Sequence, residues 1–419
     1  MRLWLIPLFY VLGSVALGIA VPRLEQAFLP ELTLSISVAS AQAYLSAVAS
    51  GMMALMSIVF AMAFVMVQFN AIAYSPRLVV WLAHDHSLFH SLGIFASTFI
   101  YALVTLAWVD RGGSGTVPWI SGVIVALLLI FSMLLFSRLV QRLSDLQITN
   151  ILAMVGAKGR SVIEDMFPLA DEAGAIALDT AGRHPGKLGE AVQELSYAGV
   201  PRSVVRLDIK KLRQLLQDAD GVAVLSCAVG DTLADGTHLL TIHAARRTVP
   251  EAVLLSAIHL DRERTFEQDP KYPIRLLVDI AIRALSPAIN DPTTAVQTLD
   301  QIEDLLRRLG RRNLDTGQIY DDAGKLRIVF PTPSWEDYLS LSFDEIRQYG
   351  SGSVQVMRRL RAVLSGLVSS LKDPARVEAV ENYRKHLDRS IGHSTLDSAD
   401  RAKAHQEDRQ GLGVTRHEA

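Results

Sequence analysis

Cysteine and charge are the two features that this sequence most clearly lacks. Cys227 is the single cysteine in 419 residues, which excludes an intrachain disulfide framework and any metal site built from several cysteines. The formal net charge is only −2, so the chain has no overall basic character, and we predict no nucleic-acid partner. Half of the residues are apolar, which excludes general disorder.

Charge is scarcest in the first third of the chain. Residues 1–140 hold nine charged side chains, which are Arg2, Arg23, Glu25, Glu31, Arg77, Asp85, Asp110, Arg111 and Arg138. A helix needs about 20 apolar residues to cross about 30 Å of hydrocarbon. The runs between these charges accommodate four such spans, near residues 3–21, 46–70, 88–109 and 117–138. We therefore predict a four-span transmembrane domain over residues 1–140, embedded in a lipid bilayer.

The first apolar run could be either a retained transmembrane span or a cleaved signal peptide. The segment Thr33–Ser46 is rich in Ser and Ala, and we interpret it as an outside helix or loop that leads into the second span. Ala39–Ala41 and Ala41–Ala43 have the small-x-small form of a signal-peptide cleavage site. Such a site normally follows the apolar run closely, whereas here charged residues intervene. We therefore favour a retained first span.

Lys and Arg near the span ends predict the orientation. With the N-terminus inside, the inner side carries Arg2, Arg77, Arg138, Arg142, Lys158 and Arg160. The outer side carries only Arg23 and Arg111. This bias predicts that the N-terminus and everything after residue 140 are cytoplasmic.

The spans lack an ionisable group near their centres, which argues against an ion-driven pump or motor. The second span instead carries small residues at helical spacing: Ala47, Ser50, Gly51, Ala54, Ser57 and Ala61. Small residues allow close helix packing. The stripe is consistent with ordinary packing, a self-association contact or the lining of a narrow pore, and Gln68 and Asn70 add polar groups near its inner end.

Two segments superficially suggest a cofactor or metal. His84, His86 and His90 flank Asp85 on the inner loop, and imidazoles with a carboxylate can bind a transition metal, but their spacing fits no defined motif. Plain interfacial histidines are the alternative interpretation. The turn Gly182–Lys187 is one residue too short for a phosphate-binding loop, and Leu188 replaces the Ser or Thr that holds magnesium. We predict no cofactor.

The remaining two thirds of the chain predict a water-exposed α+β region. An apolar stripe continues the fourth span as one helix to Gly156, and residues 141–192 form this extension and a linker. We expect a small β-sandwich or barrel-like subdomain over 193–246 and a mostly helical domain over 247–391. The polar residues 392–419 predict a disordered tail. The fold class is thus membrane α-helical plus a cytoplasmic α+β region.

Short strands dominate residues 193–246. Gln193–Ala198 and Ser203–Asp208 predict a hairpin, followed by a helix over Lys210–Gln217. Val229–Ile242 resembles the hairpin of biotinyl- and lipoyl-like β-sandwiches. The turn Gly199–Pro201 holds no lysine to accept a prosthetic group, so we predict no carrier chemistry.

Residues 261–292 concentrate the charge. Asp261–Pro270 is densely charged, and Arg275, Asp279 and Arg283 follow at i,i+4 spacing on one helix face. Asp291 is the predicted N-cap of the next helix, which begins at Pro292. We interpret this region either as an interdomain charge network or as a ligand or anion site. The candidate residues are Arg262, Glu263, Arg264, Glu267, Asp269, Arg275, Asp279, Arg283, Asn290 and Asp291.

Two motifs in this region carry a family resemblance. Glu263–Pro270 reads E-R-T-F-E-Q-D-P, and Ala284–Ala295 reads A-L-S-P-A-I-N-D-P-T-T-A. With four spans before them, they resemble a bacterial family of predicted membrane proteins, domain of unknown function 2254. The resemblance implies a bacterial inner-membrane location, and it implies no reaction, substrate or site residue.

Towards the C-terminus, Tyr320–Phe330 predicts a hairpin that turns at Asp322–Gly324. Amphipathic helices are predicted over Trp335–Gln348, Ser353–Leu371 and Pro374–Ile391.

Three function classes remain. We favour a homo-oligomeric passive channel with a cytoplasmic regulatory domain, because the second span is lined with small residues and holds no buried charge. The alternative is a non-conducting sensor or scaffold that binds a ligand or a protein through residues 261–292. A membrane enzyme is less favoured because no hydrolase, zinc-protease, dinucleotide or kinase motif occurs, and we predict no catalytic residue.

Overall fold

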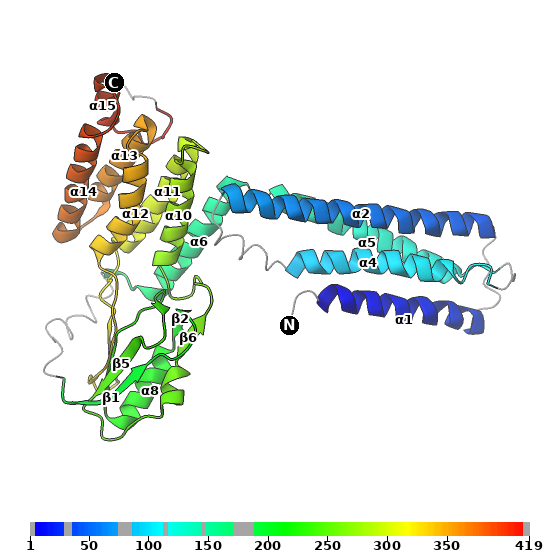
Figure 1. Ribbon diagram of the computed structural model, residues 1–419, viewed down its shortest axis with the longest axis horizontal. Coiled ribbons are helices and arrows are strands. Elements are labelled where there is room, and N and C mark those ends of the chain that lie inside the picture. Colours follow the sequence, from blue (N-terminus) through cyan, green and yellow to red (C-terminus); the bar gives the residue numbers. More distant parts are fainter. Residues whose placement is uncertain are drawn as a thin grey trace. The chain divides into compact units, whose positions relative to one another are not determined.

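The computed structural model describes residues 5–28, 36–73, 86–111, 116–144, 147–170 and 188–413 (Figure 1). The chain divides into two compact units, Met1–Gln147 and Ile148–Ala419. We call them the membrane unit and the α+β unit. The division separates the charge-poor third of the sequence from the charge-rich remainder, and each unit is described by itself below.

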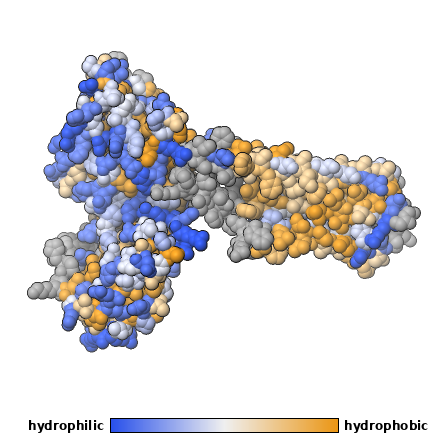
Figure 2. Space-filling view, in the orientation of Figure 1, coloured by the Kyte–Doolittle hydropathy of each residue, from blue (hydrophilic) through white to orange (hydrophobic). Residues whose placement is uncertain are grey.

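The membrane unit consists of long apolar helices, whose surface is orange in the hydropathy colouring of Figure 2. They are α1 (Leu5–Phe28), α2 (Val38–Ala73), α4 (His86–Leu106) and α5 (Trp119–Ser144). Their candidate spans are Leu5–Phe28, Val38–Val65, Leu88–Leu106 and Trp119–Gln141. The prediction of four spans is therefore confirmed. Two helix ends differ from the predicted spans. Helix α1 continues beyond residue 21 through the buried Pro22, and α2 begins at Val38, before the predicted start at residue 46.

Close packing of α1 on α4 depends on two glycines. A Cβ at Gly18 would lie 2.9 Å from Val104 Cγ1, and one at Gly93 would lie 2.5 Å from the ring of Tyr10. The absent side chains let the helices approach, as small residues do in other helix pairs within membranes. The core of the unit then forms from buried apolar side chains of α2, α4 and α5, including Met52, Val59 and Phe95.

Glu25, in the last turns of α1, is a buried carboxylate at one end of this bundle. Its Oε1 accepts a hydrogen bond from the backbone N–H of Ile120 at 3.2 Å, in the first turn of α5. This contact satisfies one of the N–H groups that every helix N-terminus leaves unpaired. Among the described residues, the buried Thr105 hydroxyl and the Trp119 indole N–H have no hydrogen-bond partner.

The prediction of one continuous helix from the fourth span to Gly156 is wrong. Helix α5 ends at Ser144, and a separate helix α6 covers Ile148–Met166. Gly156 lies inside α6 instead of ending it. A Cβ on Gly156 would lie 2.1 Å from Gln301 Oε1, so this glycine permits close packing of α6 against α11 (Pro292–Leu309).

The strands of the α+β unit form two sheets. The first has the order β1-β5-β3-β8-β7, and the second has the order β4-β2-β6. The strands are β1 (Ala191–Ser196), β2 (Arg202–Leu207), β3 (Val222–Leu225), β4 (Thr232–Leu233), β5 (His238–His243), β6 (Ile258–Asp261), β7 (Gln318–Tyr320) and β8 (Leu326–Val329). Strands β3 and β8 are parallel, and every other pair is antiparallel.

This topology corrects two predicted hairpins. Strand β1 pairs with β5 and β2 pairs with β4 and β6, so Gln193–Ala198 and Ser203–Asp208 do not pair with each other. The two strands within Val229–Ile242 likewise belong to different sheets. Burial decides the pairing, because the two sheets enclose one core that includes Leu195, Val204 and Leu240. The β-region also extends beyond residue 246, to β6, β7 and β8.

Local signals predicted the β7–β8 hairpin and the helices from α10 to α14. The β7–β8 hairpin turns at Gly324, which has a φ of 76°. The helices are α8 (Ile209–Ala219), α9 (Glu251–Leu255), α10 (Lys271–Ala284), α11, α12 (Trp335–Tyr349), α13 (Val354–Ser370), α14 (Pro374–Gly392) and α15 (Ser398–Ala404). Helices α10 to α15 gather at one end of the unit and the strands at the other (Figure 1).

The predicted disorder from residue 392 is wrong up to residue 413. Helix α15 packs against α13, and the segment after it is held by Asp408, whose carboxylate accepts the backbone N–H groups of Gly411 and Gly413. Arg358 of α13 donates to the carbonyl of Gly413 at 2.8 Å. The segment is polar because it packs over buried arginines. It therefore lacks the apolar periodicity by which a sequence indicates an ordered helix.

Candidate functional site

The E-R-T-F-E-Q-D-P motif forms the loop between β6 and α10. Asp269 is only 1% exposed, and its carboxylate lies 2.9 Å from Arg264 Nη2. Burial raises the pKa of Asp269, and the guanidinium of Arg264 opposes that shift. Gly230, with a φ of 93°, lets this pair approach, since a Cβ there would lie 2.6 Å from Asp269 Oδ2. The ion pair therefore joins two parts of the loop on the side that faces the protein interior.

The second half of the motif is shaped by Gln268. This residue has a left-handed φ of 51°, and its Oε1 accepts a hydrogen bond from the backbone N–H of Leu207 at 3.0 Å. The carboxylate of Asp269 also accepts the backbone N–H of Lys271 at 3.2 Å, at the start of α10. These contacts tie the loop to β2 and to α10, so the residues between Phe266 and Lys271 have a defined position.

These residues form one wall of a cavity of about 620 Å³. The volume falls in the range of about 300–1,000 Å³ that is usual for small-molecule sites. The other walls come from α6, from β2, from the Ala228–Val229 turn, from the β8 end and from α12. Apolar side chains predominate, namely Val162, Met166, Phe167, Leu207, Ile209, Val229, Phe266, Pro270, Ile319, Phe330, Pro331 and Pro333.

Tyr338 supplies a polar group in this apolar surrounding. Its side chain is fully buried, and its hydroxyl has no hydrogen-bond partner in the part of the chain that the structure describes. Burial raises the pKa of Tyr338, so the hydroxyl remains protonated at neutral pH. Buried hydroxyls normally have a partner, and one without a partner needs an explanation. A ligand that accepts a hydrogen bond in the cavity would provide one.

The predicted charged residues divide into three groups. Glu267 lines the cavity, while Arg264 and Asp269 lie behind its wall. Arg262 and Glu263 are exposed and do not line it.

The rest of the predicted charge ladder is a structural network elsewhere. Arg275 donates to Asp279 at 2.6 Å and forms a bidentate pair with Glu345 of α12, at 2.6 and 2.8 Å. Arg275 lowers the pKa of Glu345. Arg283 forms no ion pair with another described residue. Asp291 caps α11 by accepting the N–H of Thr294, as predicted, and Asn290 before it has a φ of 51°.

The small-residue stripe of α2 is placed on the exposed side of its helix. Ala47, Ser50, Gly51, Ala54, Ser57 and Ala61 are all exposed in the single chain. The opposite side, with Leu45, Met52 and Val59, is buried in the bundle. Packing against α4 and α5 of the same chain therefore does not account for the stripe. Gln68 is exposed as well, and the side chain of Asn70 lies outside the described residues.

The histidine group is only partly described. His84 and the side chain of His86 lie outside the described residues. The exposed His90 is paired with Tyr10, whose hydroxyl lies 3.1 Å from His90 Nδ1. Among the described residues, His, Cys, Asp and Glu nowhere gather in a group of three that could hold a metal. The turn Gly182–Lys187 also lies outside the described residues.

Sequence reasoning missed much of the cavity. Tyr338, Lys158 and Arg206 line it but are distant in sequence from the motif. Tyr338 lies on the apolar face of an amphipathic helix. The sequence therefore does not distinguish it from an ordinary core residue. The motif itself was the only available signal, and only part of it faces the cavity.

Comparison with known proteins agrees with the membrane unit and with the family resemblance. Uncharacterized proteins of Mycobacterium tuberculosis and Mycobacterium bovis are 29% identical to the chain over 415 residues, which is 95% of this chain and 78% of theirs. No solved structure matches. Residues 1–366 match the family described as "Predicted membrane protein (DUF2254)". The chain therefore belongs to this family of predicted membrane proteins.

Proposed function

We propose that this protein is a membrane-anchored receptor that binds a small ligand in the cavity of its α+β unit. The cavity supports the proposal because Glu267, Gln268 and Pro270 of the motif line it and because the hydroxyl of Tyr338 has no partner among the residues that the structure describes. An apolar cavity with few polar groups is the usual form of a small-molecule site. The proposal also takes the protein to lie in a bacterial inner membrane with this unit in the cytoplasm, which the positive-inside bias supports.

The test is amide hydrogen exchange on the full chain in lipid nanodiscs. Decanol and decanoate are suitable probes because each combines an apolar chain with one polar group. We expect at least one of them to slow exchange saturably in residues 266–271 and 316–333, which wall the cavity. Exchange reports local opening, so a probe that merely dissolves in the lipid does not produce this pattern.

Cavity-filling variants provide the control. Val229→Trp and Thr316→Trp each place an indole in the cavity from a different wall and should abolish the protection. Val192→Trp is the matched control, since Val192 is 42% exposed on β1 and does not line the cavity. Equal protection in all three variants, or no protection by either probe in the wild type, would exclude the cavity as a binding site.

A passive channel remains the second proposal, because the exposed small-residue side of α2 could form a contact between copies. The oligomeric state in nanodiscs tests it. A ring of subunits that is lost in Gly51→Leu supports a pore, since a Cβ at Gly51 meets no atom within 4 Å in the single chain. A monomer contradicts it.

A further inference from the structure

The charges around the cavity are unevenly matched. Lys158, Arg206 and Lys271 line it, against the carboxylates of Asp165 and Glu267. Neither Lys158 nor Lys271 forms an ion pair with a carboxylate of the described chain, although the charge of Lys271 opposes the rise in the pKa of the nearby Asp269. Asp165 accepts a hydrogen bond from Ser161 at 3.3 Å, and neither Asp165 nor Glu267 forms an ion pair with another described residue. The lining therefore carries three cationic side chains against two carboxylates, an excess of one positive charge.

The helix that begins at the cavity adds to this bias. Helix α10 has 14 residues, and both Pro270 and Lys271 at its start line the cavity. The N-cap Pro270 offers no side-chain hydrogen bond, and the carboxylate of Asp269 accepts the N–H of Lys271. A helix N-terminus carries partial positive charge and favours anions. Tyr338 also lines the cavity, and its fully buried hydroxyl, which has no partner among the described residues, is an independent hydrogen-bond donor.

The remaining surface is unsuited to a small inorganic ion. Lining side chains such as Val162, Phe167 and Phe330 are apolar, and the volume of about 620 Å³ exceeds what a single phosphate fills. Apolar area gains free energy only when it contacts apolar area of the ligand. We infer that the ligand is an amphipathic organic anion, with an apolar body against these side chains and an anionic group bound by Lys271 and the Tyr338 hydroxyl. This inference rests on the receptor function proposed above.

The experiment compares decanoate with decanol, which differ in their polar group. Both are titrated against the full chain in nanodiscs of zwitterionic lipid, and protection of residues 266–271 is followed. We expect decanoate to bind at least about tenfold more tightly, since hydrogen bonds to a charged group contribute about 1.5–3 kcal/mol. Lys271→Gln should remove most of that preference and leave the affinity for decanol unchanged. Lys210→Gln, on the exposed side of α8, is the matched control.

Tyr338→Phe separates binding from folding. If the hydroxyl serves the ligand, the variant weakens decanoate binding and leaves the unfolding temperature unchanged or higher, because a buried unpaired hydroxyl is removed. A lower unfolding temperature with unchanged affinity would contradict this role. In nanodiscs with phosphatidylglycerol, protection without decanoate would identify a membrane lipid as the source of the anion.

The two proposals fail in different ways. If decanol and decanoate protect the cavity equally, and Lys271→Gln changes neither, the anion inference is wrong while the receptor function stands. If neither probe protects the cavity walls, the receptor function is wrong as well.

Discussion

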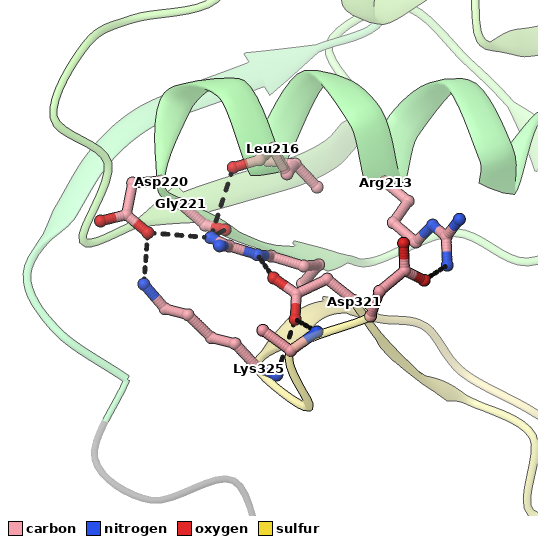
Figure 3. Close-up of polar contacts among 9 residues, drawn as sticks. Arg213, Leu216, Asp220, Gly221, Asp321 and Lys325 are labelled. Atoms are coloured by element: carbon pink, nitrogen blue, oxygen red, sulfur yellow. Dashed lines mark hydrogen bonds and ion pairs between the residues drawn. The ribbon is translucent and has the colours of Figure 1, made fainter.

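Arg327 joins the β7–β8 hairpin to the end of α8 through a set of buried contacts, and Figure 3 labels its partners Asp220, Gly221 and Asp321. Its side chain is 7% exposed and donates to Asp321 at 2.7 Å, to Asp220 at 3.2 Å and to the carbonyl of Gly221 at 3.2 Å. Asp220, at the αL C-cap of α8, also pairs with Lys325. With the carbonyl of Leu216 at 3.5 Å, two carboxylates and two main-chain carbonyls thus share one guanidinium.

Both carboxylates hold their protons weakly. Lys325 and Arg327 lower the pKa of Asp220 to about 2. The backbone N–H of Lys325, aided by Arg327, lowers the pKa of Asp321, although burial opposes this. Unfolding therefore takes up protons in acid, and the network's stabilisation is complete above the unfolded carboxylate pKa of about 4 and is lost as the pH falls towards 2.

Arg327→Met should lower the free energy of unfolding by about 3 kcal/mol at neutral pH, because it leaves the buried carboxylate of Asp321 without its cation. It should also reduce the loss of stability between about pH 4 and pH 2. Thiol labelling of Cys227 measures the first effect, since Cys227 is the single cysteine and is buried. Pulse proteolysis with pepsin measures the second.

Arg213→Met is the control for this prediction. Its pair with Asp322 is exposed, at 38% and 85% of the two side chains, and such pairs contribute little. Equal destabilisation by both substitutions would mean that the buried network contributes no more to the free energy of unfolding than an exposed ion pair.

Residues whose partners are near in sequence were predictable. The Asp291 cap and the Arg275–Asp279 pair follow from fixed helix spacing. Glu345 lies 70 residues from Arg275, and only the packing of α12 on α10 brings them together. The same holds for Tyr338, because the cavity that it lines is formed with residues from five other segments.

At the scale of elements, α6 packs on α11 through two glycines one turn apart. A Cβ at Gly159 would lie 2.8 Å from both Leu305 methyl carbons and 3.2 Å from Pro273 Cβ. Leu305 is fully buried, so these atoms have little room to move. At Gly156 the nearest atom is the end of the Gln301 side chain, which can rotate away.

We expect Gly159→Ala to destabilise the α+β unit by about 1–3 kcal/mol through overpacking. Gly156→Ala should change stability by no more than about 1 kcal/mol, because the helix preference for alanine offsets a small rearrangement of Gln301. Cys227 labelling in urea compares the two variants. Equal effects would show that α6 and α11 are not packed as closely as the glycines indicate.

Strand pairing shows why some elements could not be predicted. The two strands of the β7–β8 hairpin are joined by one short turn, and the type of that turn sets their register. All the residues that specify this pairing therefore lie in one short segment. Strand β2 has partners on β4 and β6, and β1 pairs with β5, across intervening helices and loops. Alternation identifies a strand but does not name its neighbour.

For the whole molecule, composition was the most informative signal. The scarcity of charge before residue 140 predicted the four spans, because the part of a span that crosses the hydrocarbon is about 20 predominantly apolar residues long. The C-terminal segment was misjudged for the opposite reason, since a polar segment that covers buried Arg358 and Arg361 resembles a disordered one in composition alone.

A chain that ends at residue 397 should therefore unfold more easily than the wild type. It loses α15, the hydrogen bond of His405 to Arg361 and that of the Gly413 carbonyl to Arg358, and these losses should cost about 2–4 kcal/mol. A chain that ends at residue 413 retains all three and is the control. Unchanged Cys227 labelling in the shorter chain would show that residues 398–413 do not stabilise the unit.

The hydrogen bond between Glu25 and Ile120 has a consequence for how the protein is made. The two residues are 95 positions apart, and chains are synthesised from the N-terminus. Glu25 therefore emerges from the ribosome long before the N–H group that it accepts. This hydrogen bond can form only after the first turn of α5 has been synthesised, so the contact between the end of α1 and the start of α5 is completed late in synthesis.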